Sequence, residues 1–230
     1  MYFKLSNTAD MKVLESEANA LFKYPNLYEP RVVISGLTEV SIPIITMQEP
    51  NVISLSIWGL LPSNYQDDWE LFQNLTNTLN IHTDTLNSGL WYANAFEDHR
   101  CLLPVTGYFT SILKDGEIQP YFIESEDGRP LYLAGIYSVL EDGFITSTIL
   151  TGPMDAFLGK YQNLVNYMPM LIPENRKDEW LETETKKKRA MEILNTPHGM
   201  NLKAKPIAKS LFNQDISYDS MLMPFDFPED

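Results

Sequence analysis

The sequence predicts a single α+β domain built on an antiparallel, barrel-like β-sheet with peripheral helices. Three observations support this fold class. Short β-rich runs joined by Gly-containing turns follow one another between residues 101 and 150. Helical patterns flank that block on both sides. Neither an internal repeat nor a low-complexity linker divides the 230 residues. We therefore expect one domain over 1–230, with 195–230 as an extended C-terminal segment packed on it.

The first part of the chain mixes helix and strand signals. Residues 8–23 begin with Thr8, a suitable N-cap, and continue with apolar residues at helical spacing. Residues 31–47 hold two short β-rich runs, and 52–59 alternate apolar and polar residues, which predicts strands. A short helix is expected within 67–79.

The second part begins with the strand block and ends with helices. The expected strands cover 101–105, 107–113, 119–124, 131–137 and 144–150. The hairpin signals are KDG at 114–116 and DG at 127–128. Helical patterns then cover 153–164 and a charged stretch over about 174–194, which Pro173 introduces.

The charge balance disfavours nonspecific binding to nucleic acid. Seventeen basic against 31 acidic residues give a formal net charge of −14, and a field of that sign repels polyanions. The densest basic run is 186–189, directly after an acidic stretch. Glu182 with Lys186 and Glu184 with Lys188 have i,i+4 spacing, so we expect a solvated helix with internal ion pairs rather than a DNA-binding patch.

The sequence carries no pattern for a metal, a cofactor or a membrane span. No apolar run approaches the roughly 18 residues of a membrane helix, and the N-terminus lacks a signal-peptide core, so we expect a cytoplasmic protein. The single cysteine, Cys101, lies in an apolar run and is expected to be a buried strand thiol. The three histidines form no ligand-spaced pair, and no phosphate-binding glycine motif is present. His82 and Asp84 could form a general base with its orienting carboxylate, although a surface polar pair is the simpler interpretation.

Several short motifs, taken in order, resemble the SOS response-associated peptidase (SRAP) family. Each motif is weak alone, but the shared order and near-equal spacing make the set specific. The motifs are WGLLP at 58–62, NIHTDT at 80–85, HRCLLPVTGYFTS at 99–111, PYFI at 120–123, AGI at 134–136, ILT at 149–151 and YMP at 167–169.

The resemblance implies an SRAP fold and a role in sensing abasic sites in single-stranded DNA during the SOS response to DNA damage. In that family an N-terminal cysteine captures the ring-opened sugar aldehyde through its amine and thiol. A glutamate, an asparagine and a histidine surround the cysteine, arginines hold phosphates, and an aromatic wedge stacks on a base.

This sequence departs from the family at most of those positions. The cysteine position is Tyr2, the glutamate position is Thr110, and the histidine position is Gln162, whereas Asn80 is retained. A phenol with a pKa of about 10 is a poor partner for an imine at neutral pH.

The positions expected to contact DNA differ as well. His82 and Tyr167 stand where the family has arginines, and a third arginine falls at Ala93. The wedge tryptophan falls at Asn64. Because glycines, prolines and core aromatics survive while the nucleophile, the acid/base groups and the phosphate-binding groups do not, the resemblance supports the fold and argues against the family's covalent activity.

Three functional interpretations follow. The first is a pseudoenzyme, an SRAP-like domain without covalent chemistry that can still use the old groove to contact DNA or a protein partner. The second is noncovalent single-stranded DNA binding, with tyrosines stacking on bases and a protonated histidine meeting a phosphate. Its candidate residues are Asn64, Tyr65, Asn80, His82 and Tyr167. The third is a replacement enzyme in which the α-amine of Met1, with a pKa of about 8, forms a Schiff base without a thiol.

Overall fold

A closed five-stranded barrel forms the centre of the molecule. The computed structural model describes residues 2–209. The barrel strands are β4 (Ser41–Thr46), β5 (Val52–Trp58), β7 (Arg100–Val105), β10 (Leu131–Val139) and β11 (Ile145–Pro153). They run in the order β11-β10-β7-β4-β5 with antiparallel neighbours, and a parallel pairing of β5 with β11 closes the ring. This architecture confirms the predicted α+β, barrel-like fold.

Short strands extend the barrel at two places. The strand β2 (Leu21–Phe22) pairs with β5, while β6 (Asn80–His82) and β12 (Tyr167–Pro169) both pair with β11. β11 thus brings residues near 80 and near 167 to the same end of the barrel.

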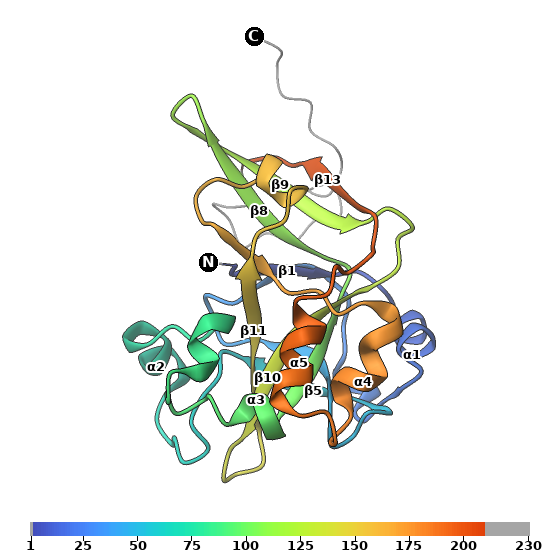
Figure 1. Ribbon diagram of the computed structural model, residues 1–230, viewed down its shortest axis with the longest axis vertical. Helices are drawn as coiled ribbons and strands as arrows, with labels where there is room; N and C mark the ends of the chain where they lie inside the picture. The colour runs from blue at the N-terminus through green and yellow to red at the C-terminus, as the bar shows by residue number, and fades with distance from the viewer. Residues whose placement is uncertain (1, 210–230) are drawn as a thin grey trace.

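A second sheet of five strands lies above the barrel (Figure 1). Its strands, in spatial order, are β13 (Leu202–Pro206), β9 (Glu117–Ser125), β8 (Gly107–Lys114), β1 (Lys4–Asn7) and β3 (Arg31–Ser35). The chain passes from the barrel to this sheet between β7 and β8, at Gly107. A Cβ there would lie 2.4 Å from the carbonyl oxygen of Ile123, so the close approach of β8 to β9 requires glycine.

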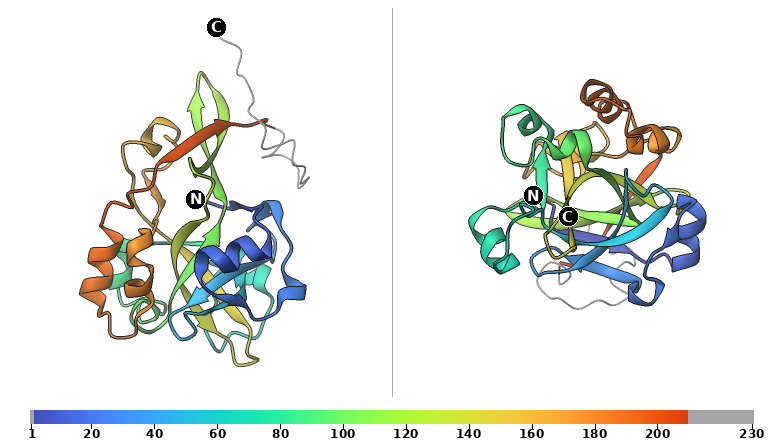
Figure 2. Two further views of the ribbon diagram at one scale, coloured as in Figure 1. Left: turned by 90° about the vertical axis from the view of Figure 1, so that its right-hand side faces the viewer. Right: turned by 90° about the horizontal axis from the view of Figure 1, so that it is seen from below.

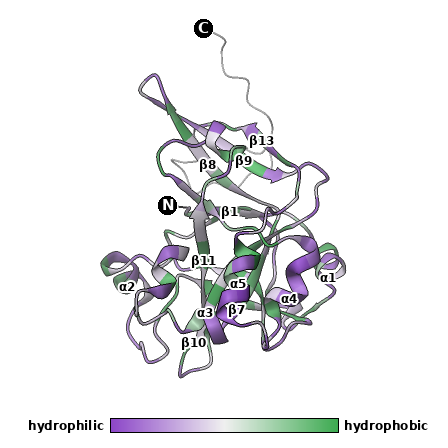
Figure 3. Ribbon diagram, in the orientation of Figure 1, coloured by the Kyte–Doolittle hydropathy of each residue, from purple (hydrophilic) through white to green (hydrophobic). Residues whose placement is uncertain are grey.

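Helices surround the barrel, as the view from below shows (Figure 2). They are α1 (Met11–Ala18), α2 (Trp69–Leu75), α3 (Ala95–Asp98), α4 (Lys177–Leu181) and α5 (Lys187–Leu194), with 3-10 turns η1 (Pro25–Leu27), η2 (Thr83–Asn87), η3 (Leu158–Lys160) and η4 (Glu174–Arg176). The helices mix hydrophobic and hydrophilic residues, as expected for elements that bury one face (Figure 3).

The barrel strands are buried on both faces because helices cover the outside. Cys101 and Leu103 of β7 point into one core cluster with Leu133, whereas Leu102 of the same strand packs in a second cluster with Trp180 of α4. This alternation follows from the two-residue period of a strand. It explains why the block 101–150 is so rich in apolar residues.

Buried Arg100 attaches two helices to the barrel. Its guanidinium is fully buried and donates to the carbonyl oxygens of Phe96 (3.1 Å), Glu97 (2.9 Å) and Glu182 (2.8 Å), while Nε donates to that of Trp180 (2.9 Å). These carbonyls lie at the ends of α3 and α4, where helices leave acceptors without partners.

Arg100 also accounts for one wrong prediction, the continuous helix over 174–194. The chain leaves helical geometry at Glu182, whose carbonyl Arg100 binds, and α5 starts only at Lys187. The predicted pairs of Glu182 with Lys186 and Glu184 with Lys188 therefore lose the helical spacing on which they depended. Arg189 instead pairs with Glu179 across the break.

Two further helix predictions need correction. The first helix starts at Met11 with Asp10, not Thr8, as its N-cap; the Asp10 carboxylate accepts from the Val13 amide at 3.0 Å. It ends at Asn19, whose φ of 50° is left-handed. Within 153–164 only η3 (Leu158–Lys160) is helical, because β11 continues to Pro153.

The expected C-terminal segment is described only in part. Residues 202–206 form β13, which pairs antiparallel with β9. Residues 210–230 of the predicted extended segment lie outside the described residues. The division into one domain over 1–230, with an extended C-terminal segment, therefore stays a prediction.

Candidate functional site

The backbone of Tyr2 is held at the edge of the barrel by Asn80. The Tyr2 amide donates to Oδ1 of Asn80 at 3.1 Å, and Nδ2 of Asn80 donates back to the Tyr2 carbonyl at 2.5 Å. Asn80 opens β6 and lies opposite Ile149 of β11. This two-way amide contact fixes where the N-terminal segment enters β1.

The phenol of Tyr2 points into a buried polar network. The Tyr2 side chain is 2% exposed, and its hydroxyl donates to Oε1 of Gln162. The same oxygen accepts from the Thr110 hydroxyl at 2.6 Å, and Nε2 of Gln162 donates to the carbonyls of Tyr167 (2.7 Å) and Val165 (3.2 Å). Each polar group of the Gln162 side chain is therefore satisfied inside the protein.

Burial determines the protonation state of this phenol. Loss of water around Tyr2 raises the pKa of its hydroxyl well above the usual value, and the hydrogen bonds with Gln162 and Thr110 offset only part of that rise. The ring of Tyr108 packs edge-on against Tyr2 at 5.7 Å between centroids, and burial raises the pKa of Tyr108 as well. Near neutral pH the site therefore offers a neutral phenol, an amide and an alcohol.

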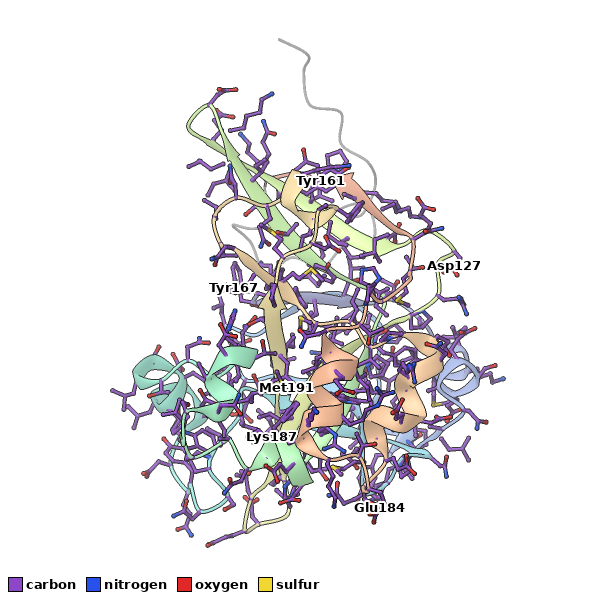
Figure 4. All side chains as sticks on the ribbon, viewed as in Figure 1. Asp127, Tyr161, Tyr167, Glu184, Lys187 and Met191 are labelled. Atoms are coloured by element: carbon purple, nitrogen blue, oxygen red, sulfur yellow. The ribbon has the colours of Figure 1, made fainter. Side chains whose placement is uncertain are left out.

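Two rings continue from this network toward the surface. The Tyr167 ring lies 6.5 Å from that of Tyr2 and 5.8 Å from that of His82, edge-on in both cases. Tyr167 lies at the waist between the barrel and the upper sheet (Figure 4). The His82 side chain is 33% exposed, with Nδ1 3.4 Å from the Asp84 carboxylate. His82 and Tyr167 approach each other because β6 and β12 flank β11.

The structure thus brings together six of the positions that the sequence singled out. They are Tyr2, Asn80, His82, Thr110, Gln162 and Tyr167. The functional roles of these residues stay predictions.

The other candidate positions lie elsewhere. Tyr65 packs against Phe72 of α2, with 4.9 Å between ring centroids, and its hydroxyl donates to the Asp68 carbonyl at 2.9 Å. Asn64, beside it, is exposed. Ala93 is buried at 7% exposure.

A second polar pair, His198 with Asp155, was not predicted from the sequence. Nε2 of His198 lies 3.4 Å from the carboxylate of Asp155, and Nδ1 of His198 accepts from the Met200 amide at 3.1 Å. Both residues line a hollow of about 300 Å³ with Met168 and other apolar side chains. The Asp155 charge also contributes to the raised pKa of Tyr2. Forty-three residues separate this pair, so only the fold brings it together.

The described residues contain no group of three or more His, Cys, Asp and Glu side chains that could hold a metal ion. Cys101 is fully buried inside the barrel, where burial raises the pKa of its thiol. Within residues 2–209 no helix has the length and apolar character needed to cross a membrane.

Comparison with known protein families shows to which family the chain is related. The family model described as SOS response associated peptidase (SRAP) matches residues 1–214. The chain belongs to this family. The SRAP assignment agrees with the resemblance in the sequence motifs and with the barrel fold.

One curated relative is similar over part of its length. The chain is 28% identical over 141 residues to a protein of Saccharomyces cerevisiae named abasic site processing protein. The match covers 59% of this chain and 36% of the yeast protein, so the chain spans about a third of that relative.

Three solved structures share the SRAP fold of this chain at low sequence identity. A protein from Bacteroides thetaiotaomicron has a TM-score of 0.84 and 20% identity, covering 97% of this chain and 99% of its own. A protein from Bordetella bronchiseptica has a TM-score of 0.74 and 16% identity, with coverages of 90% and 99%. A phage-related protein from the same organism has a TM-score of 0.64 and 20% identity, with coverages of 90% and 94%.

Proposed function

We propose that this chain is an SRAP protein of the abasic-site response that has lost the family's covalent thiol chemistry. The membership in the SRAP family and the yeast relative named for abasic site processing support the link to abasic DNA. The observation that carries the loss is the Tyr2–Gln162–Thr110 network, which occupies the positions where the sequence resemblance puts cysteine, histidine and glutamate.

The chemistry of those three side chains supports the proposal. Capture of an aldehyde as a stable thiol adduct needs a thiol and a group that can move a proton. The Gln162 amide and the Thr110 hydroxyl do not titrate near neutral pH, and the buried Tyr2 phenol stays neutral. The only cysteine, Cys101, is enclosed in the barrel.

A crosslinking assay tests this proposal. The full chain is incubated with single-stranded DNA carrying one abasic site, with and without borohydride, and resolved on a denaturing gel. We expect no adduct without borohydride. A borohydride-independent adduct would overturn the proposal, and an adduct seen only after reduction would favour an imine with an amine, the third interpretation.

A designed variant sharpens the assay. The triple substitution Tyr2→Cys, Thr110→Glu and Gln162→His returns the three family residues to one site. If the absence of these three residues is the reason that no adduct forms, the triple variant should form a borohydride-independent adduct. This requires removal of Met1, so that the amine and the thiol belong to the same residue. Thr110→Glu with Gln162→His but without Tyr2→Cys is the matched control, and it stays unreactive.

Noncovalent binding of single-stranded DNA is the second candidate function. The observation that favours it is the pair of half-buried rings, His82 and Tyr167, beside the Tyr2 network. Fluorescence anisotropy with a labelled 20-nucleotide deoxythymidine strand tests it. Binding that weakens steeply with salt and is lost in Tyr167→Ala supports DNA contact, because phosphate contacts must release counterions. If the strand does not bind, or binds with an affinity that does not depend on salt, the result contradicts DNA binding and favours the protein-interaction role.

A further inference from the structure

A chain of aromatic rings lies on α2 and on the segment that precedes α3. The ring of Phe72 is 4.9 Å from Tyr65 and 6.2 Å from Trp91, and Trp91 is 5.4 Å from Tyr92. Exposed leucines lie on the same two segments as these rings. We call this set the Trp91 surface: Tyr65, Leu71, Phe72, Leu75, Leu90 and Trp91.

Much of the Trp91 surface is open to solvent. Leu71 is 53% exposed, Leu75 79%, Leu90 46% and Trp91 43%. Leu71 and Leu75 are one helical turn apart and therefore share a face of α2. A cluster of large apolar side chains left in water is typical of a site that another molecule covers.

The exposed face is not needed to hold α2 in place. The buried face of the helix carries Trp69, at 5% exposure, and Gln73, at 8%. Nε1 of Trp69 donates to the Trp58 carbonyl at 3.1 Å, and Gln73 exchanges hydrogen bonds of 2.9 Å with Thr78. Because α2 is anchored on that side, Leu71 and Leu75 are available to contact a partner.

Acidic residues at the start of α2 border the Trp91 surface, and in the described part of the chain they have no cationic partners. Asp67, Asp68 and Glu70 lie at the start of α2, and none of them takes part in an ion pair among the described residues. The whole stretch 32–99 contains no lysine or arginine. Lys187 of α5 reaches this stretch at the Leu86 carbonyl and at Glu97, but no ion pair of the described residues neutralises Asp67, Asp68 or Glu70, so these acids can attract cations.

We propose that the Trp91 surface docks a lysine- or arginine-rich amphipathic segment of another protein. Its apolar side chains would cover Leu71, Leu75 and Trp91, and its cations would meet Asp67 and Glu70. Two other occupants fit less well. The phosphates of single-stranded DNA would face the same acids, and a second copy of this chain would bring a second set of them.

Trp91 is a built-in reporter for this docking. The other three tryptophans, Trp58, Trp69 and Trp180, are 0%, 5% and 0% exposed. The probe is a synthetic 16-residue peptide of leucine and lysine in a helical amphipathic pattern. We expect saturable change of tryptophan emission that weakens as salt rises. A peptide with glutamate in place of lysine and a 20-nucleotide deoxythymidine strand should produce no change.

Paired variants separate this surface from a general attraction to a protein of charge −14. Leu71→Ser with Leu75→Ser should weaken peptide binding about tenfold or more, which corresponds to loss of roughly two apolar contacts. Leu27→Ser with Leu37→Ser, which removes leucines of 67% and 60% exposure on other elements, is the matched control. Asp67→Asn with Glu70→Gln should weaken binding and flatten the salt dependence, whereas Glu29→Gln with Glu39→Gln should not.

The outcomes decide the proposal. Equal losses in the test and control pairs mean nonspecific attraction and overturn it. Saturable binding of the DNA strand at Trp91, or concentration-dependent dimerisation in sedimentation that Leu75→Ser abolishes, also overturns it in favour of the other occupants. Circular dichroism of each variant confirms that the fold is intact.

Discussion

The Tyr2 network, made of Tyr2, Thr110 and Gln162, differs from the Trp91 surface in whether its side chains find their interaction partners within the protein. At Tyr2, three buried side chains exchange hydrogen bonds among themselves and with backbone carbonyls. At Trp91, apolar side chains remain exposed beside acids without cationic partners in the described part of the chain. A closed polar network stabilises the fold, whereas an open apolar and charged face can gain free energy only from a partner. The comparison predicts opposite responses to mutation.

The largest expected effect is at Gln162. Substitution Gln162→Leu removes the acceptor of the buried Thr110 hydroxyl, leaves the Tyr2 hydroxyl only the Tyr167 carbonyl at 3.3 Å, and removes the donor to the Tyr167 and Val165 carbonyls, at a cost of about 1–3 kcal/mol for each group left unsatisfied. We expect the free energy of unfolding to fall by about 3 kcal/mol, as measured by urea denaturation. Gln66→Leu, at an exposed position where the amide contacts Glu141, is the control and should change it by less than about 0.5 kcal/mol. A loss at Gln162 no larger than the control would mean that the network is open to water.

An intermediate effect is expected for Tyr2→Phe. At pH 8 the loss of the hydroxyl, which donates to Gln162 and more weakly to the Tyr167 carbonyl, should lower the free energy of unfolding by about 1 kcal/mol. The pH dependence of the free energy of unfolding tests the burial of the phenol more directly. The folded pKa of Tyr2 lies above the unfolded value of about 10, so the unfolded chain releases this proton first. Its contribution is therefore complete below about pH 10 and is lost as the pH rises further, by at most about 1.4 kcal/mol per pH unit.

The measurement compares urea unfolding of wild type and Tyr2→Phe at pH 8 and pH 11. The gap between the two proteins should narrow at the higher pH, because only the wild type has the Tyr2 proton to lose. Tyr24→Phe, at a tyrosine 55% exposed, is the matched control. A constant gap across this pH range would contradict a buried, neutral Tyr2.

The sequence was sufficient to predict the barrel because local signals agreed with the fold. The alternating residues of 101–150 lie on strands, and the hairpin turns fall between them. The prediction of a continuous helix over 174–194 was wrong because a distant residue, Arg100, binds the Glu182 carbonyl, at which the helix ends. No local pattern within that segment shows such a contact.

The candidate site was predictable only through the motifs shared with the SRAP family. Thr110 and Gln162 are 52 residues apart, and neither is unusual by itself. The Asp155–His198 pair and the Trp91 surface could not be predicted, because both depend on side chains from segments that meet only in the folded chain.

The smallest expected effect on stability is at Trp91. Trp91→Ser removes a large aromatic side chain, yet its exposed position beside Phe72 should limit the loss in free energy of unfolding to about 0.5 kcal/mol. Trp180→Phe is the contrasting control, because Trp180 is fully buried and donates to the Cys101 carbonyl at 3.0 Å; its loss should cost about 2 kcal/mol. Acrylamide quenching of the same variants supplies the second measurement. Trp91→Ser should remove the quenchable part of the emission, while Trp180→Phe should preserve it. If Trp91→Ser lowers the free energy of unfolding as much as Trp180→Phe does, Trp91 stabilises the fold. The proposed difference between the Tyr2 network and an exposed surface available to a partner would then be wrong.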